Sequence, residues 1–162
     1  MSLELKTIKV DKPDDVNVII GQSHFVKTVE DIYEVLISSV PSIKFGLAFC
    51  EASGKCLVRI EGNDKDLKKL AAENALNIGC GHMFFIILKE AYPINVLNQI
   101  KNVSEVCHIF CATANPLEII VALTKQGRGF MGIVDGFPPK DIETEQEAKE
   151  RRQLLRKFGY KL

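Results

Sequence analysis

Six consecutive apolar residues, Met83 to Leu88, constrain the fold of this chain more than any other segment. A continuous apolar run of this length is typical of a strand that is covered on both faces. A strand with one face in water would instead alternate between apolar and polar residues. The run therefore predicts a sheet with further layers packed against it, which is the arrangement of an α/β fold.

The rest of the chain predicts strands and helices in alternation. Apolar stretches bounded by turn residues predict seven further strands, at about 3–10, 16–21, 44–52, 55–61, 106–112, 117–124 and 129–134. Apolar residues at helical spacing predict four helices, at about 28–40, 63–78, 93–102 and 142–158. Hairpins are expected around Ser53-Gly54 and Gln126-Gly127. We interpret residues 1–162 as a single domain with a three-layer α/β/α fold, in which hairpins and helical crossovers build a mixed sheet.

Residue types at the helix ends support these boundaries. Thr28 is expected to cap the first helix, with Asp31 at the capping-box position. Asn63-Asp64 is expected to cap the second helix and Gly79 to end it in a left-handed conformation. Pro93 suits the start of the third helix. In the last helix, acidic residues come first and basic residues last, which complements the helix dipole and favours a solvated face over a binding patch.

Charge and composition exclude several classes of protein. The chain has 21 basic and 21 acidic residues and no net charge, so no basic field holds a nucleic acid. No apolar run approaches the roughly 20 residues that cross a bilayer, and the N-terminus lacks the layout of a signal peptide. The five cysteines are odd in number and form no Cys-x-x-Cys pair, which favours buried thiols over disulfides or zinc. A soluble cytoplasmic protein without a nucleic-acid or membrane partner is expected.

The common nucleotide and hydrolase motifs are absent from the sequence. There is no Gly-x-x-x-x-Gly-Lys-Ser/Thr loop, no Gly-x-Gly-x-x-Gly turn, no Gly-x-Ser-x-Gly elbow and no His-Glu-x-x-His pair. Any activity must therefore use a less usual site.

The strongest local signal is Gln126-Gly127-Arg128-Gly129, followed by Asp135-Gly136. The glycines let a ligand approach the backbone, and the planar guanidinium of Arg128 suits phosphate or carboxylate. Asp135 follows a strand, where ligands of α/β proteins usually bind. The plainer interpretation is two turns, with Arg128 paired to a surface acid, and the spacing alone favours it.

Polar residues follow other strands as well. His24 precedes a helix start, which suits an anion, and is a candidate for an acid, a base or a phosphate contact. Asn115 offers an amide that can recognise a base edge. Glu51, Glu118 and Asp135 are candidate Mg²⁺ ligands. A structural histidine, a plain Asn-Pro turn and solvated carboxylates are the alternatives. If the segments converge, one pocket gathers them.

Four segments together resemble the adenosine-specific kinase family, small proteins of archaea and some bacteria. They are Gly21 to Phe25, Lys44 to Gly54, Phe110 to Pro116, and Gln126-Gly127-Arg128-Gly129 with Asp135-Gly136. The resemblance extends from about Leu3 to Tyr160. It implies a compact three-layer α/β fold, assembly as a homotrimer, binding of adenosine or AMP, and phosphoryl transfer to adenosine.

The leading hypothesis is an enzyme that phosphorylates the 5′-hydroxyl of adenosine with ATP and Mg²⁺. Arg128 would hold phosphate, Asp135 would act as base or Mg²⁺ ligand, and His24 would contact phosphate or move a proton. Asn115 would recognise the nucleoside. The other expected binding residues are Gln22, Ser23, Gln126, Gly127 and Gly129. The alternatives are a non-catalytic sensor of adenosine or AMP, and a purely structural trimer.

Overall fold

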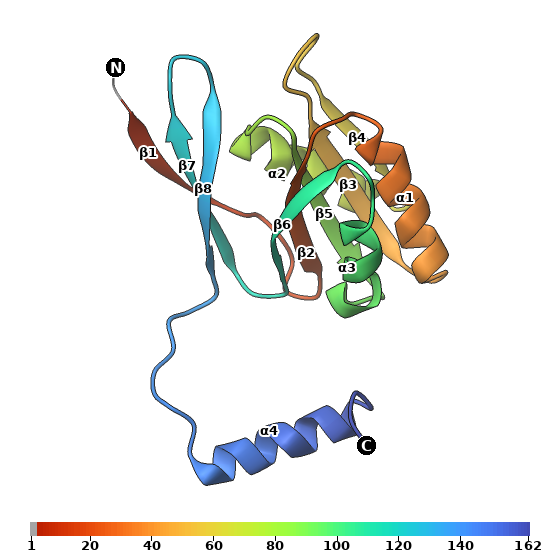
Figure 1. Cartoon of the computed structure of the whole chain (residues 1–162), viewed down its shortest axis with the longest axis vertical. Helices are drawn as coiled ribbons and strands as arrows, with labels where there is room; N and C mark the ends of the chain where they lie inside the picture. Colours follow the sequence, from red (N-terminus) through yellow and green to blue (C-terminus); the bar gives the residue numbers. More distant parts are fainter. Residues whose placement is uncertain (1–2) are drawn as a thin grey trace.

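The computed structural model describes residues 3–162, and in this part of the chain eight strands alternate with four helices. The strands are β1 (Glu4–Lys9), β2 (Asn17–Ser23), β3 (Lys44–Cys50), β4 (Val58–Gly62), β5 (Met83–Lys89), β6 (Val106–Thr113), β7 (Leu117–Leu123) and β8 (Arg128–Asp135). The helices are α1 (Thr28–Ser39), α2 (Lys65–Ile78), α3 (Pro93–Lys101) and α4 (Glu145–Lys157). All twelve elements expected from the sequence are confirmed, with bounds that shift by a few residues (Figure 1).

The apolar run forms β5, the central strand of a five-stranded sheet with the order β4-β3-β5-β2-β6. Its residues Met83 to Leu88 are all buried. Met83, Phe85 and Ile87 belong to one hydrophobic cluster, whereas Phe84, Ile86 and Leu88 belong to another. This alternation confirms the expected strand with both faces covered.

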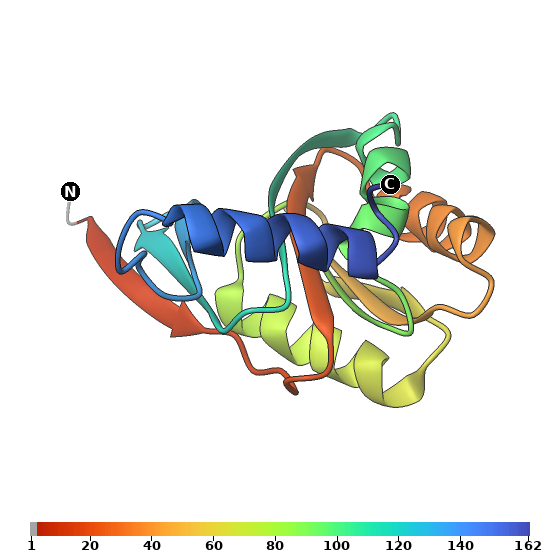
Figure 2. The same cartoon turned by 90° about the horizontal axis from the view of Figure 1, so that it is seen from below.

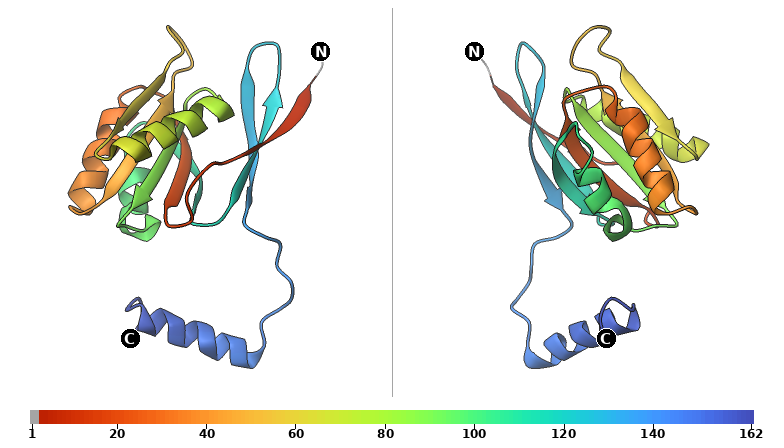
Figure 3. Two further views of the ribbon diagram at one scale, coloured as in Figure 1. Left: turned by 180° about the vertical axis from the view of Figure 1, so that it is seen from behind. Right: turned by 45° about the vertical axis from the view of Figure 1, so that its right-hand side comes forward.

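The two faces of this sheet are covered by different partners. Apolar residues of α1 and α3 pack on one face, and those of α2 pack on the other (Figure 3). On the α2 side, a second sheet with the order β1-β7-β8 adds its own buried residues, such as Ile119 and Val121. The mixed α/β content is confirmed, but the expected three-layer α/β/α arrangement is not, because a second sheet also packs on the α2 side.

The expected mixed sheet is wrong, because every pair of neighbouring strands in both sheets is antiparallel. The helical crossovers do connect strands of the same direction. Each crossover, however, skips one position: β5 lies between β2 and β3, β3 lies between β4 and β5, and β2 lies between β5 and β6. The skipped positions are filled by antiparallel strands from elsewhere in the chain.

Most helix boundaries agree with their end signals. The Asp64 carboxylate accepts the backbone N–H groups of Asp66 and Leu67, each at 3.0 Å, and Gly79 has a φ of 64°. The expected cap at Thr28 is wrong, because Thr28 is the first residue of α1 and is fully buried. Its hydroxyl donates toward the carbonyl of Phe25, so it stabilises the preceding turn.

The five cysteines are all free, as expected. Cys50 and Cys80 are buried, and burial raises the pKa of the Cys50 thiol to about 12. Cys56 and Cys107 are exposed, so the expectation of buried thiols is wrong for these two. Cys56 lies in the loop between β3 and β4, and Cys107 lies on the edge strand β6, so neither position is covered by other elements.

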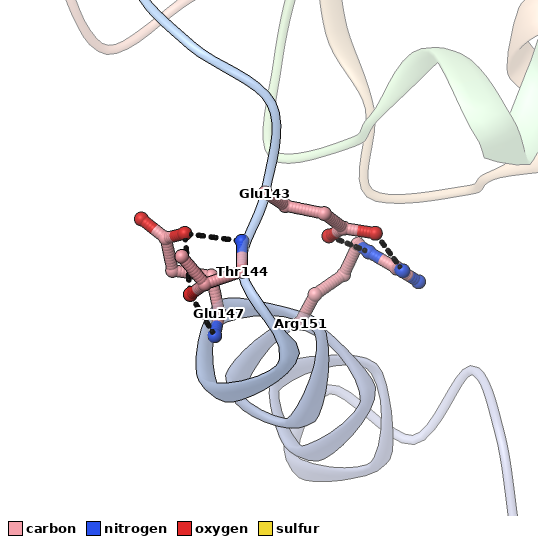
Figure 4. A network of polar contacts seen from close by, with 4 residues as sticks. All are labelled: Glu143, Thr144, Glu147 and Arg151. Carbon is pink, nitrogen blue, oxygen red and sulfur yellow. Dashed lines mark hydrogen bonds and ion pairs between the residues drawn. The ribbon is translucent and has the colours of Figure 1, made fainter.

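The last helix, α4, has no buried residue and lies below the two sheets in Figure 1. Its N-terminal end is defined by local polar contacts (Figure 4). The Thr144 hydroxyl accepts the N–H of Glu147, and the Glu147 carboxylate accepts the N–H of Thr144 in return. Arg151 donates two hydrogen bonds to Glu143, at 2.6 and 2.9 Å. The acidic start and basic end expected for this helix are confirmed.

Candidate functional site

Several predicted segments meet at one end of the five-stranded sheet. The N–H of Ser23 donates to the carbonyl of His82 at 3.0 Å, and the N–H of His82 donates to the carbonyl of Cys50 at 2.8 Å. Cys80 forms an isolated bridge with Arg128, which brings the small sheet to the same place. We call this end, with His24, Glu51, Arg59, His82 and Arg128, the arginine end.

Arg128 lies across the C-terminal end of α2. Its Nη1 donates to the carbonyls of Asn77 at 2.6 Å and Ile78 at 3.2 Å, which lack partners inside the helix. The negative end of the helix dipole favours this cation. Its Nε and Nη2 make no hydrogen bond to the part of the chain that the structure describes. The side chain is therefore held in place by one nitrogen while the other two remain able to bind an anion.

The glycines beside Arg128 lie on open surface. A Cβ added to Gly127 or Gly129 would meet nothing within 4 Å, so a ligand or another subunit has room to approach. The N–H groups of Gln126 and Gly127, however, both donate to the Thr124 hydroxyl at 3.2 Å. The hairpin therefore does not offer these N–H groups for a phosphate, and the arginine side chain is the main anion donor here.

Three polar residues, Gln22, Ser23 and His24, were expected to follow the second strand, and their surroundings differ. Ser23 is the last residue of β2, is 1 % exposed, and its hydroxyl lies 2.8 Å from that of Thr28, within hydrogen-bond distance. Gln22 is half-buried within the same strand, and only His24 is exposed. Because the strand runs two residues further than expected, His24 is the one of the three that is open to a ligand.

Glu51 forms an ion pair that sequence analysis missed. Its Oε1 accepts from Arg59 Nε at 2.7 Å, and its Oε2 accepts from the N–H of Leu57 at 3.0 Å. The hydrogen bond from Arg59, together with that backbone N–H, lowers the pKa of Glu51 below its ordinary value. Both oxygens are engaged, so Glu51 is poorly placed to bind Mg²⁺. The signal that could have found Arg59 is the β3–β4 hairpin, which pairs Arg59 with Phe49, two residues before Glu51.

Two hollows border Glu51 at the arginine end. One, of about 330 Å³, is lined by Glu51, Gly81 and Arg128 among others. The other, of about 750 Å³, is lined by Lys27, Glu51 and Arg59 among others. The larger hollow is also lined by Glu30 and Glu61, so its charges balance toward the acidic side, whereas the smaller hollow is bordered by the Arg128 guanidinium and is the one that suits an anionic ligand.

The backbone of His82 is strained, which the sequence pattern did not predict. Its φ is 61°, in the left-handed region that non-glycine residues seldom adopt. Its ring stacks on Phe49 with centroids 5.8 Å apart. His82 lies directly before β5, so this strained residue adds a second imidazole to the arginine end.

A second group of predicted residues meets at the opposite end of the molecule. The Asp135 carboxylate accepts two hydrogen bonds at Oδ1, from the Thr113 hydroxyl at 2.8 Å and from Asn115 Nδ2 at 3.0 Å. Gly136 follows with a φ of 66°, and a Cβ there would lie 3.1 Å from the Asn115 amide. The turn at Asn115-Pro116 and the turn at Asp135-Gly136 are thus in contact. We call this group the Asp135 end.

The two ends are far apart within one chain. Arg128 and Asp135 are the first and last residues of β8, which has eight residues. At about 3.3 Å per residue, their backbones lie on the order of 20 Å apart. The single pocket expected from the sequence therefore does not form within one chain, because the two motifs occupy opposite ends of the same strand.

No preformed metal centre is visible in residues 3–162. In this range no three or more His, Cys, Asp and Glu side chains are grouped so as to hold a metal ion. Glu118 is exposed on β7 and pairs across the sheet with Val134. Asp135 keeps one oxygen, Oδ2, without a donor among the described residues.

Among the described residues, no helix is long and apolar enough to span a bilayer.

Comparisons with known proteins place this geometry in a family. The sequence model of a family described as adenosine specific kinase matches residues 8–161. A crystal structure of the PH1918 protein from Pyrococcus horikoshii OT3 is similar to this chain, with a TM-score of 0.96 and 49 % identity over 99 % of each chain. No curated protein matches the chain.

Proposed function

Because the chain belongs to the adenosine-specific kinase family, we propose that it is an enzyme that transfers the γ-phosphoryl group of ATP to the 5′-hydroxyl of adenosine. The products are AMP and ADP. The family match over nearly the whole chain carries this proposal. Phosphoryl transfer needs in-line positioning and neutralised charge more than covalent chemistry, so the absence of a phosphate-loop motif does not oppose it.

Asp135 is the proposed base. Its Oδ1 is held by Thr113 and Asn115, which orients the carboxylate and leaves Oδ2 for a substrate hydroxyl. The 5′-oxygen bonds to the γ-phosphorus as the bond from phosphorus to ADP breaks, and the hydroxyl proton passes to Oδ2. Asn115 serves mainly to position this carboxylate.

Arg128 is the proposed phosphate ligand. Two of its nitrogens have no partner among the described residues, and the adjoining hollow is open beside Glu51 and Gly81. A guanidinium binds two phosphate oxygens at once and neutralises their charge in the transition state. For His24, which is exposed at the same end, we propose that it contacts phosphate or relays a proton. Gln22, Gln126, Gly127 and Gly129 would shape this end, and Ser23 would support it from inside.

We propose a homotrimer in which one subunit supplies Asp135 and another supplies Arg128. The separation of these residues within one chain supports this arrangement. The helix α4 supports it too, because it has no buried residue in its own chain. A helix of 13 residues is marginal alone in water, so α4 needs an apolar surface to pack on.

Mg²⁺ fits this site as a companion of ATP. It is usually held by one or two carboxylates with water and phosphate oxygens. Oδ2 of Asp135 supplies one such ligand, whereas Glu51 is occupied by Arg59 and Leu57. When bound, the ion would neutralise phosphate charge. We further propose that residues 1–162 act as one domain and that the protein is cytoplasmic.

The test is AMP formation from adenosine, ATP and Mg²⁺. Asp135→Asn should abolish turnover while adenosine binding persists, because an amide cannot take the proton. Asp66→Asn, an exposed carboxylate at the start of α2, is the matched control and should turn over normally. Unchanged turnover by Asp135→Asn would remove Asp135 from the chemistry.

A sensor that binds adenosine or AMP without turnover is the second candidate. The N–H groups of Gln126 and Gly127 are already bonded to Thr124, so the chain lacks a backbone phosphate cradle there. Tight binding by the wild type, with no AMP formed over hours, would favour the sensor over the kinase.

A further inference from the structure

A cleft at the Asp135 end has not been assigned a role. It has a volume of about 520 Å³ and lies between the start of α3 and the segment that follows α4. Its walls include Tyr92 and Ile94 from the first and Phe158 and Tyr160 from the second. In Figure 2, which views the molecule from below, the C-terminal segment lies in front of α3, and in Figure 1 it lies below α3, so the cleft faces this segment across from the helix start. The volume is within the range of small-molecule sites.

The walls of this cleft are aromatic and open to solvent. Tyr92 is 63 % exposed, Phe158 is 60 % exposed and Tyr160 is 48 % exposed. Exposed aromatic side chains that gather around one hollow suit a planar ligand, because each ring offers a face for stacking. A stacked heterocycle would remove this apolar surface from water.

Polar groups of two kinds border the same cleft. Asn17, at the start of β2, lines it and makes no side-chain hydrogen bond to residues 3–162. Its amide can donate and accept at once, as the N6 and N7 edge of adenine requires. Thr113 also lines the cleft and connects it to Asp135, because its hydroxyl donates to Asp135 Oδ1.

We infer that this cleft binds the purine base of the nucleoside, with Tyr160 and Phe158 against the ring, Asn17 at its edge and the ribose directed toward Asp135. The inference rests on the proposed function, since it names the base-binding part of that site. The aromatic walls set affinity, and Asn17 sets the preference for adenine over a 6-oxo purine. The C-terminal segment thereby becomes part of the binding site.

The experiment is a calorimetric titration of the full chain with adenosine and, separately, with inosine. Tyr160→Ala should weaken adenosine binding at least tenfold, and Tyr160→Phe, which keeps the ring, should restore it. Asn17→Ala should reduce the ratio of adenosine to inosine affinity at least fivefold. Leu5→Ala, which truncates an exposed apolar side chain on β1 that lines neither this cleft nor the hollows of the arginine end, is the control and should bind adenosine like the wild type.

The outcomes separate the two proposals. Wild-type binding that is unaffected by Tyr160→Ala and Asn17→Ala overturns this inference and leaves the proposed function standing. Equal weakening by Leu5→Ala also overturns it, since the effect is then not specific to the cleft. A wild type that binds neither adenosine nor AMP overturns the proposed function and this inference together. Thermal unfolding of each variant verifies that these exposed substitutions leave the fold intact.

Discussion

Arg128 combines a structural and a proposed functional role in one side chain. Its Nη1 satisfies two carbonyls at the end of α2, while its remaining nitrogens border the hollow beside Glu51. The structural contact fixes where the guanidinium lies. A preorganised cation of this kind binds phosphate at a smaller entropic cost than a free side chain.

Arg128→Ala should weaken AMP binding at least tenfold, which corresponds to about 1.4 kcal/mol, and leave adenosine binding nearly unchanged. Only AMP carries the phosphate that the guanidinium would hold. The variant should also lose about 0.3–1 kcal/mol of stability from the end of α2. Calorimetry with both ligands measures the first effect, and chemical denaturation measures the second.

Lys125→Ala is the control for Arg128→Ala, because it removes an exposed positive charge from the same hairpin. Equal loss of AMP affinity in the two variants would indicate a general charge effect and would contradict a specific role of Arg128. Arg128→Lys keeps the charge but loses the planar fork, so it should bind AMP with intermediate affinity.

The Glu51–Arg59 pair predicts a pH dependence of stability. The pKa of Glu51 is lowered from its ordinary value of 4.5, mainly by the hydrogen bond from Arg59. A carboxyl whose pKa is lower in the folded state stabilises the fold above its unfolded pKa. That stabilisation is lost as the pH falls through the folded value.

Glu51→Gln should therefore lower the unfolding temperature at pH 7, and the difference from the wild type should shrink as the pH falls below about 4.5. Thermal unfolding between pH 3 and 7 measures this. Glu73→Gln, in an exposed pair with Lys69, should show a smaller difference. A difference for Glu51→Gln that is constant across this pH range would contradict the assigned cause.

At the scale of elements, the contact between α2 and β3 depends on one glycine. A Cβ at Gly46 would lie 2.1 Å from the carbonyl oxygen of Leu67 and 2.4 Å from the N of Lys68. These are backbone atoms of a helix and cannot swing aside. The helix therefore lies directly on the strand, which brings its C-terminal end to Arg128.

Gly46→Ala should destabilise the protein by at least about 3 kcal/mol, because the helix must move away from the sheet. Gly132→Ala is the control, since a Cβ there meets nothing within 4 Å, and it should change stability by less than about 0.5 kcal/mol. Denaturant unfolding compares the two variants. Similar stabilities would show that α2 adjusts freely on the sheet.

At the scale of the whole molecule, the proposed shared site needs residues from two subunits. Each chain carries one Arg128 and one Asp135 at opposite ends of β8. A trimer built around the exposed α4 could bring an arginine end of one chain to the Asp135 end of the next. Activity would then depend on assembly.

Mixing two inactive variants, Asp135→Asn and Arg128→Ala, should restore part of the kinase activity after subunit exchange. A mixed trimer contains intact sites in which one chain supplies Arg128 and its neighbour supplies Asp135. The double variant mixed with wild type is the control for dilution of sites. If the mixture of single variants stays inactive although exchange is demonstrated, the shared site is contradicted.

Local patterns in the sequence determined the elements and much of their placement. The apolar run of β5, the carboxylate cap at Asp64 and the left-handed Gly79 depend on neighbours within a few residues, so periodicity and end signals predicted them. The polar segments at strand ends were predicted for the same reason. The meeting of Asn115 with Asp135 also follows from the hairpin of β7 and β8.

Only the tertiary structure decided which strands are neighbours and which motifs share an end. Sequence spacing shows that α1 connects β2 to β3, but the position of β5 between them depends on burying both faces of β5 at once. The same packing places Arg128 and Asp135 at opposite ends of the molecule, because they begin and end one strand. Contacts between distant segments are selected by the free energy of the whole core, which no local pattern contains.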